Sequence, residues 1–349
     1  MTAPRYKWQP TTSEIARRAG IAPSDVIRFD HNTSPFPTDW ASELAAEVSR
    51  SLNEYPGASY LPIREAAGDF VGLEPERVAV GAGVDELLLL VGRAFLGPGR
   101  RSLAIAPTYP LYRIASLQVG ATLTEVPAGP DLAFPTDAFV RAARDADVTW
   151  LCVPDNPSGA RLPEATIEAV IAATDGIVVL DAAYAEFAGD EWAAWAERYH
   201  NLLVLHTMSK GFGLGGIRVG YGLGHPDLVD ALDGVRPPGS IASISVEIAI
   251  AALREPERMR KQVASIITER SALADRLRGL GFAPLPSRTN FLLCHAGGDA
   301  RAVGEALMGE GLVVRMYPTD GPLGAYLRFT VRSTSENDRL IAALERILP

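Results

Sequence analysis

The feature that most constrains the fold is a repeated pattern of a short apolar run, a polar or glycine-containing loop, and a helix. The apolar runs assigned to strands are 77–80, 103–106, 122–126, 149–153, 177–180 and 202–206. Strands that alternate with helices in this way predict an α/β fold, with a mostly parallel central sheet flanked by helices on both faces. In such sheets, ligands bind beyond the carboxyl ends of the strands.

The pattern changes after Pro237 and Pro238. Helical spacing over 245–281, interrupted near Pro256, leads into three further apolar runs and a last helix. Those runs are 290–294, 312–315 and 326–331, and the helix is 336–347. We therefore expect a smaller α+β domain, completed by the N-terminal residues. The expected division is an N-terminal arm over 1–45, a large domain over 46–239 and a small C-terminal domain over 240–349.

Composition excludes several classes of function. The net charge of -9 over 349 residues argues against nucleic acid or an anionic membrane surface as a general partner. Cys152 and Cys294 lie in apolar runs and form no disulfide framework, which predicts reduced thiols and a cytoplasmic location. No apolar run approaches the ~20 residues of a membrane-spanning helix. We expect no metal site.

One lysine stands out in segment 206–221. The chain has three lysines, Lys7, Lys210 and Lys261, and its other basic residues are arginine. Lysine can lose its proton and attack an aldehyde, whereas arginine cannot deprotonate in a protein. Lys210, which follows two hydroxyl residues and precedes a glycine-rich run, is therefore a candidate nucleophile. The alternative interpretation is a surface lysine beside a flexible loop.

Residues with chemical potential fall at five different strand ends. They are Gly83, Tyr109, Asn156, Asp181 and Lys210. Core packing alone does not account for this placement. The turn before Val84 and Asp85 also opens a helix, whose free N–H groups and dipole favour an anion. A dinucleotide-binding turn would use the same device, but Glu86 stands where its third glycine is required.

These residues match what an enzyme needs to use pyridoxal 5'-phosphate. Lys210 supplies the amine for the covalent link, and Asp181 a carboxylate for the pyridine nitrogen. Tyr184 and Asn156 can donate to the ring phenolate oxygen, and Tyr109 can stack on the ring. We expect five residues to bind the phosphate: Val84, Asp85, Thr207, Ser209 and Arg218. Taken singly, each residue also has a structural interpretation, such as a helix cap for Asp181 or core packing for Tyr184.

Seven short motifs occur in order along nearly the whole chain. They are 55–56 (YP), 81–86 (GAGVDE), 107–109 (PTY), 156–159 (NPSG), 181–184 (DAAY), 209–213 (SKGFG) and 327–330 (LRFT). In these motifs the chain resembles the fold-type I pyridoxal-phosphate enzymes, in the histidinol-phosphate aminotransferase-like branch of the aspartate aminotransferase superfamily. The resemblance implies transfer of an amino group from an L-amino acid or amino phosphate, such as histidinol phosphate, to a 2-oxo acid such as 2-oxoglutarate.

The same resemblance implies roles for individual residues. Lys210 would link to the cofactor and carry a proton between the substrate α-carbon and the cofactor. Arg328 would bind the substrate carboxylate as a two-pronged fork, with Asn32 and Asn156 also at the substrate. Tyr55 would reach the phosphate of a neighbouring subunit, which implies a homodimer with composite active sites.

The chain departs from the family pattern at several positions, and because of these departures the motifs do not decide which substrate is used. The early loop reads Asn-Thr-Ser-Pro over 32–35, and Ala182, His206 and Arg332 replace the usual Glu, Arg and Gly. Arg332 is interpreted either as a contact for a second substrate anion or as a solvated strand end. His31 is either a substrate contact or a loop histidine.

Two other functions remain as alternatives. A threonine-phosphate decarboxylase would share the cofactor but break a different bond at the α-carbon. A cofactor-bound ligand sensor would have no catalysis, but sensors of this fold usually carry a DNA-binding domain, for which no residues are left over.

Overall fold

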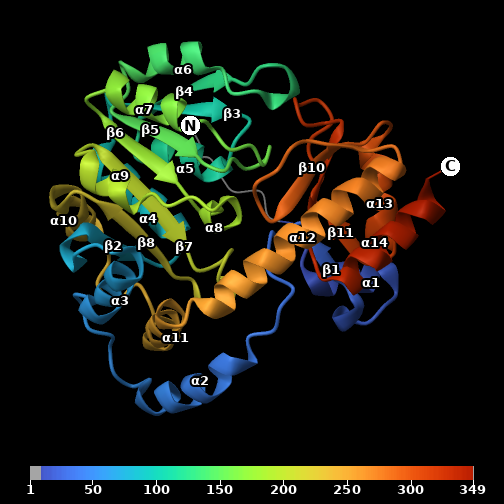
Figure 1. Ribbon diagram of the computed structural model, residues 1–349, viewed down its shortest axis with the longest axis horizontal. Helices are drawn as coiled ribbons and strands as arrows, with labels where there is room; N and C mark the ends of the chain where they lie inside the picture. Colours follow the sequence, from blue (N-terminus) through green and yellow to red (C-terminus); the bar gives the residue numbers. More distant parts are fainter. Residues whose placement is uncertain (1–8, 349) are drawn as a thin grey trace.

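The computed structural model describes residues 9–348, so Lys7 and the first eight residues of the expected arm lie outside the described residues. Figure 1 shows a broad sheet covered by helices on both faces and a smaller lobe of strands and helices beside it. The long helix α12 (Glu257–Gly279) runs from the base of the larger part to the smaller lobe. The described helices include none that combines the length and apolar character needed to cross a bilayer.

The central sheet has seven strands. In spatial order they are β2 (Val78–Gly81), β8 (Gly220–Gly224), β7 (Leu202–Thr207), β6 (Ile177–Asp181), β5 (Val148–Cys152), β3 (Arg101–Ala106) and β4 (Thr122–Pro127). Strand β8 is antiparallel to both of its neighbours, and the other pairings are parallel. The predicted α/β fold with a mostly parallel sheet is confirmed.

Alternation along the strands builds a hydrophobic layer on each face of this sheet. In β7, Leu203 and Leu205 join the core beneath one set of helices, while Leu202 and Val204 join the core on the other face. The first set is α4 (Val84–Phe95), α5 (Pro110–Gln118) and α10 (Pro226–Val235). The second set includes α3 (Leu61–Val71), α6 (Thr136–Ala143), α7 (Glu164–Ala173), α8 (Ala185–Ala188), α9 (Ala193–Arg198) and α11 (Ser243–Arg254).

The smaller lobe contains segments from both the N-terminal and the C-terminal parts of the chain. Strand β1 (Ile27–Phe29) pairs in parallel with β11 (Leu312–Val314), so the N-terminal segment becomes part of this lobe. A second sheet places β10 (Phe291–His295) between β12 (Tyr326–Thr330) and β9 (Ala283–Pro284). Helices α1 (Thr12–Ala19), α13 (Ala300–Gly309) and α14 (Thr334–Ile347) complete it. The domain boundaries at 45 and 239 stay predictions, and α11 packs against α3 and α2 (Ser42–Val48), although it begins after 239.

Several elements were not predicted from the sequence, namely α1, α6, α8, α9, β8, α10, β9 and α13. Strand β8 shows why, because its sequence GYGLG carries three glycines, which are normally depleted in strands. A Cβ at Gly222 would lie 3.1 Å from the Leu205 side chain, so neighbouring β7 packs closely against this backbone. Helical spacing over 41–52 predicts one helix there, but the structure has the shorter α2 flanked by 3-10 turns at Asp39–Ala41 and Ser49–Ser51.

Candidate active site

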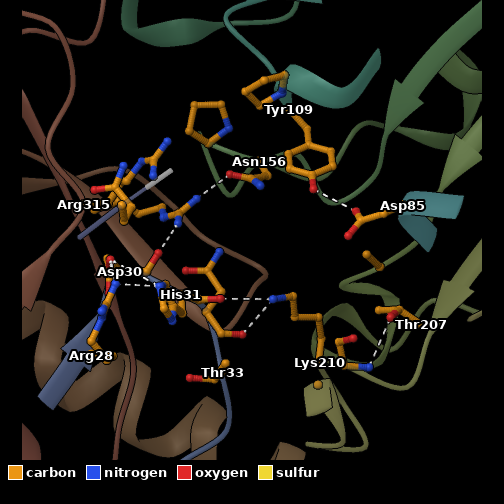
Figure 2. Close-up of a pocket in the computed structure, with 18 of the residues that line it drawn as sticks. Arg28, Asp30, His31, Thr33, Asp85, Tyr109, Asn156, Thr207, Lys210 and Arg315 are labelled. Carbon is orange, nitrogen blue, oxygen red and sulfur yellow. Dashed lines mark hydrogen bonds and ion pairs between the residues drawn. The ribbon is translucent and has the colours of Figure 1, made fainter. Parts of the chain in front are cut away.

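A cavity of about 880 Å³ opens at the carboxyl ends of the central strands, between the sheet and the smaller lobe. Figure 2 shows side chains from both parts converging on it. The predicted site residues that line it are Asn32, Val84, Asp85, Tyr109, Asn156, Asp181, Tyr184, Thr207, Ser209, Lys210, Arg218 and Arg328. Gly83 and Tyr55 were also predicted, but they are not part of this lining. The cavity therefore gathers side chains from strand ends that are far apart in sequence.

Lys210 follows β7 and extends its amine across the cavity. Its Nζ donates to the backbone carbonyls of Asn32, at 3.0 Å, and His31, at 3.2 Å (Figure 2). Burial of the amine, together with a smaller contribution from the nearby Arg328, lowers the pKa of Lys210 to about 8. A larger share of neutral, nucleophilic amine is therefore present near neutral pH than for an exposed lysine.

Asp181 ends β6 and is almost fully buried. Its carboxylate accepts hydrogen bonds from the Tyr112 hydroxyl at 2.7 Å and from the Ala183 N–H at 3.1 Å. Burial raises the pKa of Asp181 to about 6, while these two donors act in the opposite direction. The sequence analysis missed Tyr112, although it lies three residues after Tyr109 and therefore on the same side of α5. Its ring stacks on Trp150 with centroids 5.6 Å apart.

Tyr184 lies just beyond β6, next to the N-terminal segment. Its hydroxyl accepts a hydrogen bond from Asn32 Nδ2 at 3.0 Å, so its own proton is left to donate. The Asn32 N–H donates to the Thr330 hydroxyl at 2.9 Å, which fixes this loop against β12. The amine of Lys210 lies 5.9 Å from the centre of the Tyr184 ring. Tyr184 and Lys210 thus face each other in one buried cluster.

The N-terminal end of α4 also borders the cavity, at Val84 and Asp85. Gly83 adopts a φ of +82°, and a Cβ there would lie 2.7 Å from Arg218, so this turn favours glycine. Arg218 donates to Asp85 at 2.9 Å and to Ser209 Oγ at 3.4 Å. The Tyr109 hydroxyl donates to the other Asp85 oxygen at 2.8 Å. A guanidinium, a hydroxyl and the N–H groups of a 12-residue helix meet here, which is a suitable environment for a phosphate.

Arg328 extends from β12 and is buried. One guanidinium nitrogen donates to Asn156 Oδ1 at 2.6 Å, and the other to the carbonyl of Asp30 at 2.8 Å. Its Nε is buried without a hydrogen-bond partner in the described part of the chain. The guanidinium also lies 5.0 Å from the centre of the Phe291 ring. A cation held this firmly can bind an anionic group of a ligand.

Arg315 also lines the cavity, and the sequence analysis did not identify it. It follows β11 and exchanges two backbone hydrogen bonds with Arg328, at 3.0 and 3.1 Å. The available signal was its position at the end of the apolar run 312–315, close to a strand end like the residues that were predicted. Arg28 also lines the cavity, but Asp30 accepts from it at 2.7 and 2.8 Å. The cavity therefore has a cationic side that only the smaller lobe and the N-terminal segment create.

Two residues that depart from the family pattern, Arg332 and His206, lie in different environments from each other. Arg332 donates to Glu336 at 2.7 Å and does not line the cavity. His206 is buried and stacks on Tyr221, with ring centres 5.1 Å apart. Its Nδ1 lies 4.0 Å from Glu186 Oε1 and has no hydrogen-bond partner within residues 9–348. Burial lowers the pKa of His206 to about 4 and raises that of Glu186 to about 8.

Tyr55 lies on the surface with 94% of its side chain exposed. Leu52 and Leu61, which flank it in sequence, are the other large apolar side chains exposed in the described chain. Apolar side chains gathered in one exposed segment are typical of a surface that another protein covers.

Comparison with known proteins gives matches over almost the whole chain. Residues 24–344 match the family described as aminotransferase class I and II. A histidinol-phosphate aminotransferase of Thermococcus gammatolerans is 37% identical over 324 residues, which cover 92% of either chain. That of Thermobifida fusca is 35% identical over 90% of this chain and 89% of its own.

Solved structures agree with these matches. Histidinol-phosphate aminotransferase from Sinorhizobium meliloti, in complex with pyridoxal-5'-phosphate, has a TM-score of 0.90 at 28% identity, covering 98% of this chain and 95% of that chain. An L-threonine-O-3-phosphate decarboxylase from Porphyromonas gingivalis has a TM-score of 0.77 over 90% of this chain and 100% of that chain. Its 21% identity shows a shared fold alone.

Proposed function

The chain belongs to the class I and II aminotransferase family, and we propose that its amino donor is histidinol phosphate and its acceptor 2-oxoglutarate. It is a pyridoxal-phosphate-dependent aminotransferase. The decarboxylase alternative is not favoured, because the relatives above 30% identity carry the aminotransferase name and the decarboxylase is similar in fold only. The ligand-sensor alternative has no support from these relatives.

The residues of the cavity fit this cofactor. The partly neutral amine of Lys210 can form the covalent link, and the buried carboxyl of Asp181 can hold a proton on the ring nitrogen. The turn at Gly83 leaves no room for a Cβ beside Arg218, so backbone and guanidinium can approach one phosphate together. We assign Thr207 and Ser209 to the same phosphate, and Tyr109 to the face of the ring.

Pyridoxal phosphate, when bound, supplies an aldehyde for linkage to an amine and a ring that delocalises the electron pair left at the substrate α-carbon. Lys210 would take the proton that leaves this carbon and return one to the cofactor. Asp181 would hold a proton at the ring nitrogen, and the hydrogen bond from Tyr112 orients its carboxylate. Tyr184 and the free amide of Asn156 can donate to the ring oxygen, because Asn32 and Arg328 already occupy their acceptor atoms.

Two arginines on paired backbone segments support a phosphate-bearing amino donor. Arg328 and Arg315 are linked by backbone hydrogen bonds and both line the cavity, and Arg315 lies on the side opposite Asp85 (Figure 2). A phosphate near neutral pH carries up to two negative charges and offers three oxygens, which suits two guanidinium forks better than one carboxylate does. This pair of arginines is the observation that carries the choice of histidinol phosphate. The shorter carboxylate of 2-oxoglutarate can use Arg328 alone.

We also propose a homodimer in which Tyr55 completes the partner's site. The exposed Tyr55 does not line its own cavity, and Leu52 and Leu61 leave apolar surface around it. The proposed location is the cytoplasm, because Cys152 and Cys294 are free, buried thiols.

The test is a donor screen with the loaded enzyme. Glutamate formation from 2-oxoglutarate is measured with histidinol phosphate, histidinol, phenylalanine and threonine phosphate, and carbon dioxide is measured in parallel. We expect kcat/KM for histidinol phosphate to exceed the other values, with no carbon dioxide. A preference for unphosphorylated donors would contradict the assigned donor, and carbon dioxide from threonine phosphate would contradict the reaction.

A further inference from the structure

Two of the five histidines of the chain meet at the end of the central sheet that faces away from Lys210. His200 lies just before β7, and His225 lies just after β8. Because these neighbouring strands are antiparallel, with Leu203 opposite Gly224, the start of one meets the end of the other. Asp227, in the first turn of α10, lies beside both histidines. Three potential metal ligands from two connections are therefore gathered outside the active site.

The atoms of this cluster are spaced as metal ligands are. Asp227 Oδ2 lies 3.3 Å from His225 Nδ1 and 3.7 Å from His200 Nε2, and one potential ligand atom from each of the three residues lies within 4.8 Å of the other two. A tetrahedral zinc site with bonds of ~2.0–2.1 Å places its ligand atoms ~3.3–3.4 Å apart. One edge already has this length, and the second exceeds it by a few tenths of an ångström. Small rotations of the exposed His200 and Asp227 side chains can close the difference.

The chemistry of the cluster selects among metal ions. Two imidazoles and one carboxylate suit Zn²⁺ and similar transition-metal ions, whereas Mg²⁺ prefers six oxygen ligands. The ring centres of His200 and His225 lie 4.1 Å apart and the rings are tilted by 41°, so the two imidazoles already lie side by side. The carboxylate of Asp227 offsets the positive end of the α10 dipole, which would otherwise oppose a cation there.

We propose that His200, His225 and Asp227 form a Zn²⁺ site with water as the remaining ligand, which clips the β8–α10 connection to the segment before β7. A metal-free interpretation also exists, because His225 Nδ1 accepts from the Asp227 N–H at 3.3 Å and so caps α10. The two interpretations differ in what His200 does. It takes no part in the cap, but the zinc site requires it. No metal site was expected from the sequence, in which the two histidines are separated by 24 intervening positions and form no ligand motif.

The test uses tag-free, cofactor-loaded enzyme that has been freed of metals. Zn²⁺ alone is titrated against a chelating indicator for the wild type, His200→Ala, Asp227→Asn and the control His295→Ala. His295 accepts from the Gly297 N–H in a similar short-range contact but lies outside the cluster. We expect one Zn²⁺ per chain, unaffected by His295→Ala or by excess Mg²⁺. His200→Ala and Asp227→Asn should weaken binding at least as much as the ~10–100-fold caused by loss of an outer-shell partner.

Thermal unfolding gives a second readout, which does not depend on catalysis. Zn²⁺ should raise the unfolding temperature of the wild type and of His295→Ala but not that of His200→Ala, because a ligand stabilises only the state that binds it. Equal binding by all four proteins, or no binding by the wild type at 100-fold excess of Zn²⁺ over protein, would overturn the proposal. Since amino transfer is not measured, failure here leaves the proposed function standing, and the converse also holds.

Discussion

The cavity floor consists of Asp85, Asp181 and Lys210, which follow strands of one continuous sheet. The cavity wall consists of Asn32, Arg315 and Arg328, and its segments lie as much as 298 residues apart. The floor is positioned by β-strand pairing within one sheet, which has a hydrophobic layer on each face. The wall depends on the pairing of β1 with β11 and on hydrogen bonds between loops. We infer that the floor carries the chemistry common to the family, while the wall selects the substrate.

The two sides are coupled electrostatically. Arg328 of the wall lowers the pKa of Lys210 of the floor, and Lys210 donates to the backbone of the loop that carries Asn32. A change in the wall therefore reaches the reacting amine without touching the sheet. Substitutions on either side can separate the two contributions.

The largest effect is expected from Lys210→Ala in the cavity floor. This change removes the amine that we propose links to the cofactor and moves the proton, so kcat/KM should fall by more than ~10⁴-fold. Steady-state glutamate formation measures it. Lys261→Ala, in an exposed position on α12, is the matched control and should retain full activity. Comparable activity of the two variants would show that Lys210 of the cavity floor takes no part in catalysis.

Arg315→Ala tests the cavity wall. Loss of a hydrogen-bonded charge is worth about 1.5–3 kcal/mol, so kcat/KM for histidinol phosphate should fall by roughly 10–150-fold. Histidinol, which has no phosphate, should be affected much less. The control is Arg332→Ala, which removes an arginine that is paired with Glu336 outside the cavity. If both substitutions have the same effect on both donors, the wall does not recognise the phosphate.

Arg328→Gln tests the coupling between wall and floor. With a pKa of about 8, about one Lys210 amine in ten is neutral at pH 7, and the neutral form prevails above pH 8. Removal of the Arg328 charge should raise this pKa and slow cofactor uptake by the apoenzyme several-fold at pH 7. Uptake should recover at higher pH. The rate of change in cofactor absorbance against pH measures the midpoint, and an unchanged midpoint would contradict the coupling.

Glu186→Gln tests the buried pair behind the floor and should have the smallest effect. Burial raises the pKa of Glu186 from 4.5 to about 8, so between these values the folded state keeps a proton that the unfolded state loses. Its contribution therefore makes the wild type less stable as pH rises through this window. Glu186→Gln should flatten this trend and unfold roughly 2–4 °C higher than the wild type at pH 8. The exposed Glu43→Gln is the control, and an equally steep trend in Glu186→Gln would show that the group does not titrate there.

The floor was predictable because parallel strands bring their carboxyl ends to one edge. A residue placed directly after a buried apolar run, such as Asp181 or Lys210, is then near every other residue placed in the same way. Strand β8 escaped prediction because its glycines, which allow close packing against β7, erase the apolar pattern. Tyr112 escaped because a tyrosine inside a helix has the same sequence signature whether it packs or orients a carboxylate.

The sequence by itself determined the alternation of strands and helices, and with it the edge at which the motif residues gather. Both depend on local periodicity, which short-range sterics and burial enforce. Only the tertiary structure decided which arginine after a late strand faces the cavity, Arg315 rather than Arg332, and how far the Lys210 pKa falls. These properties arise from desolvation and from charges brought close by the smaller lobe. Local sequence contains no signal for the orientation of these arginines or for the size of this pKa change.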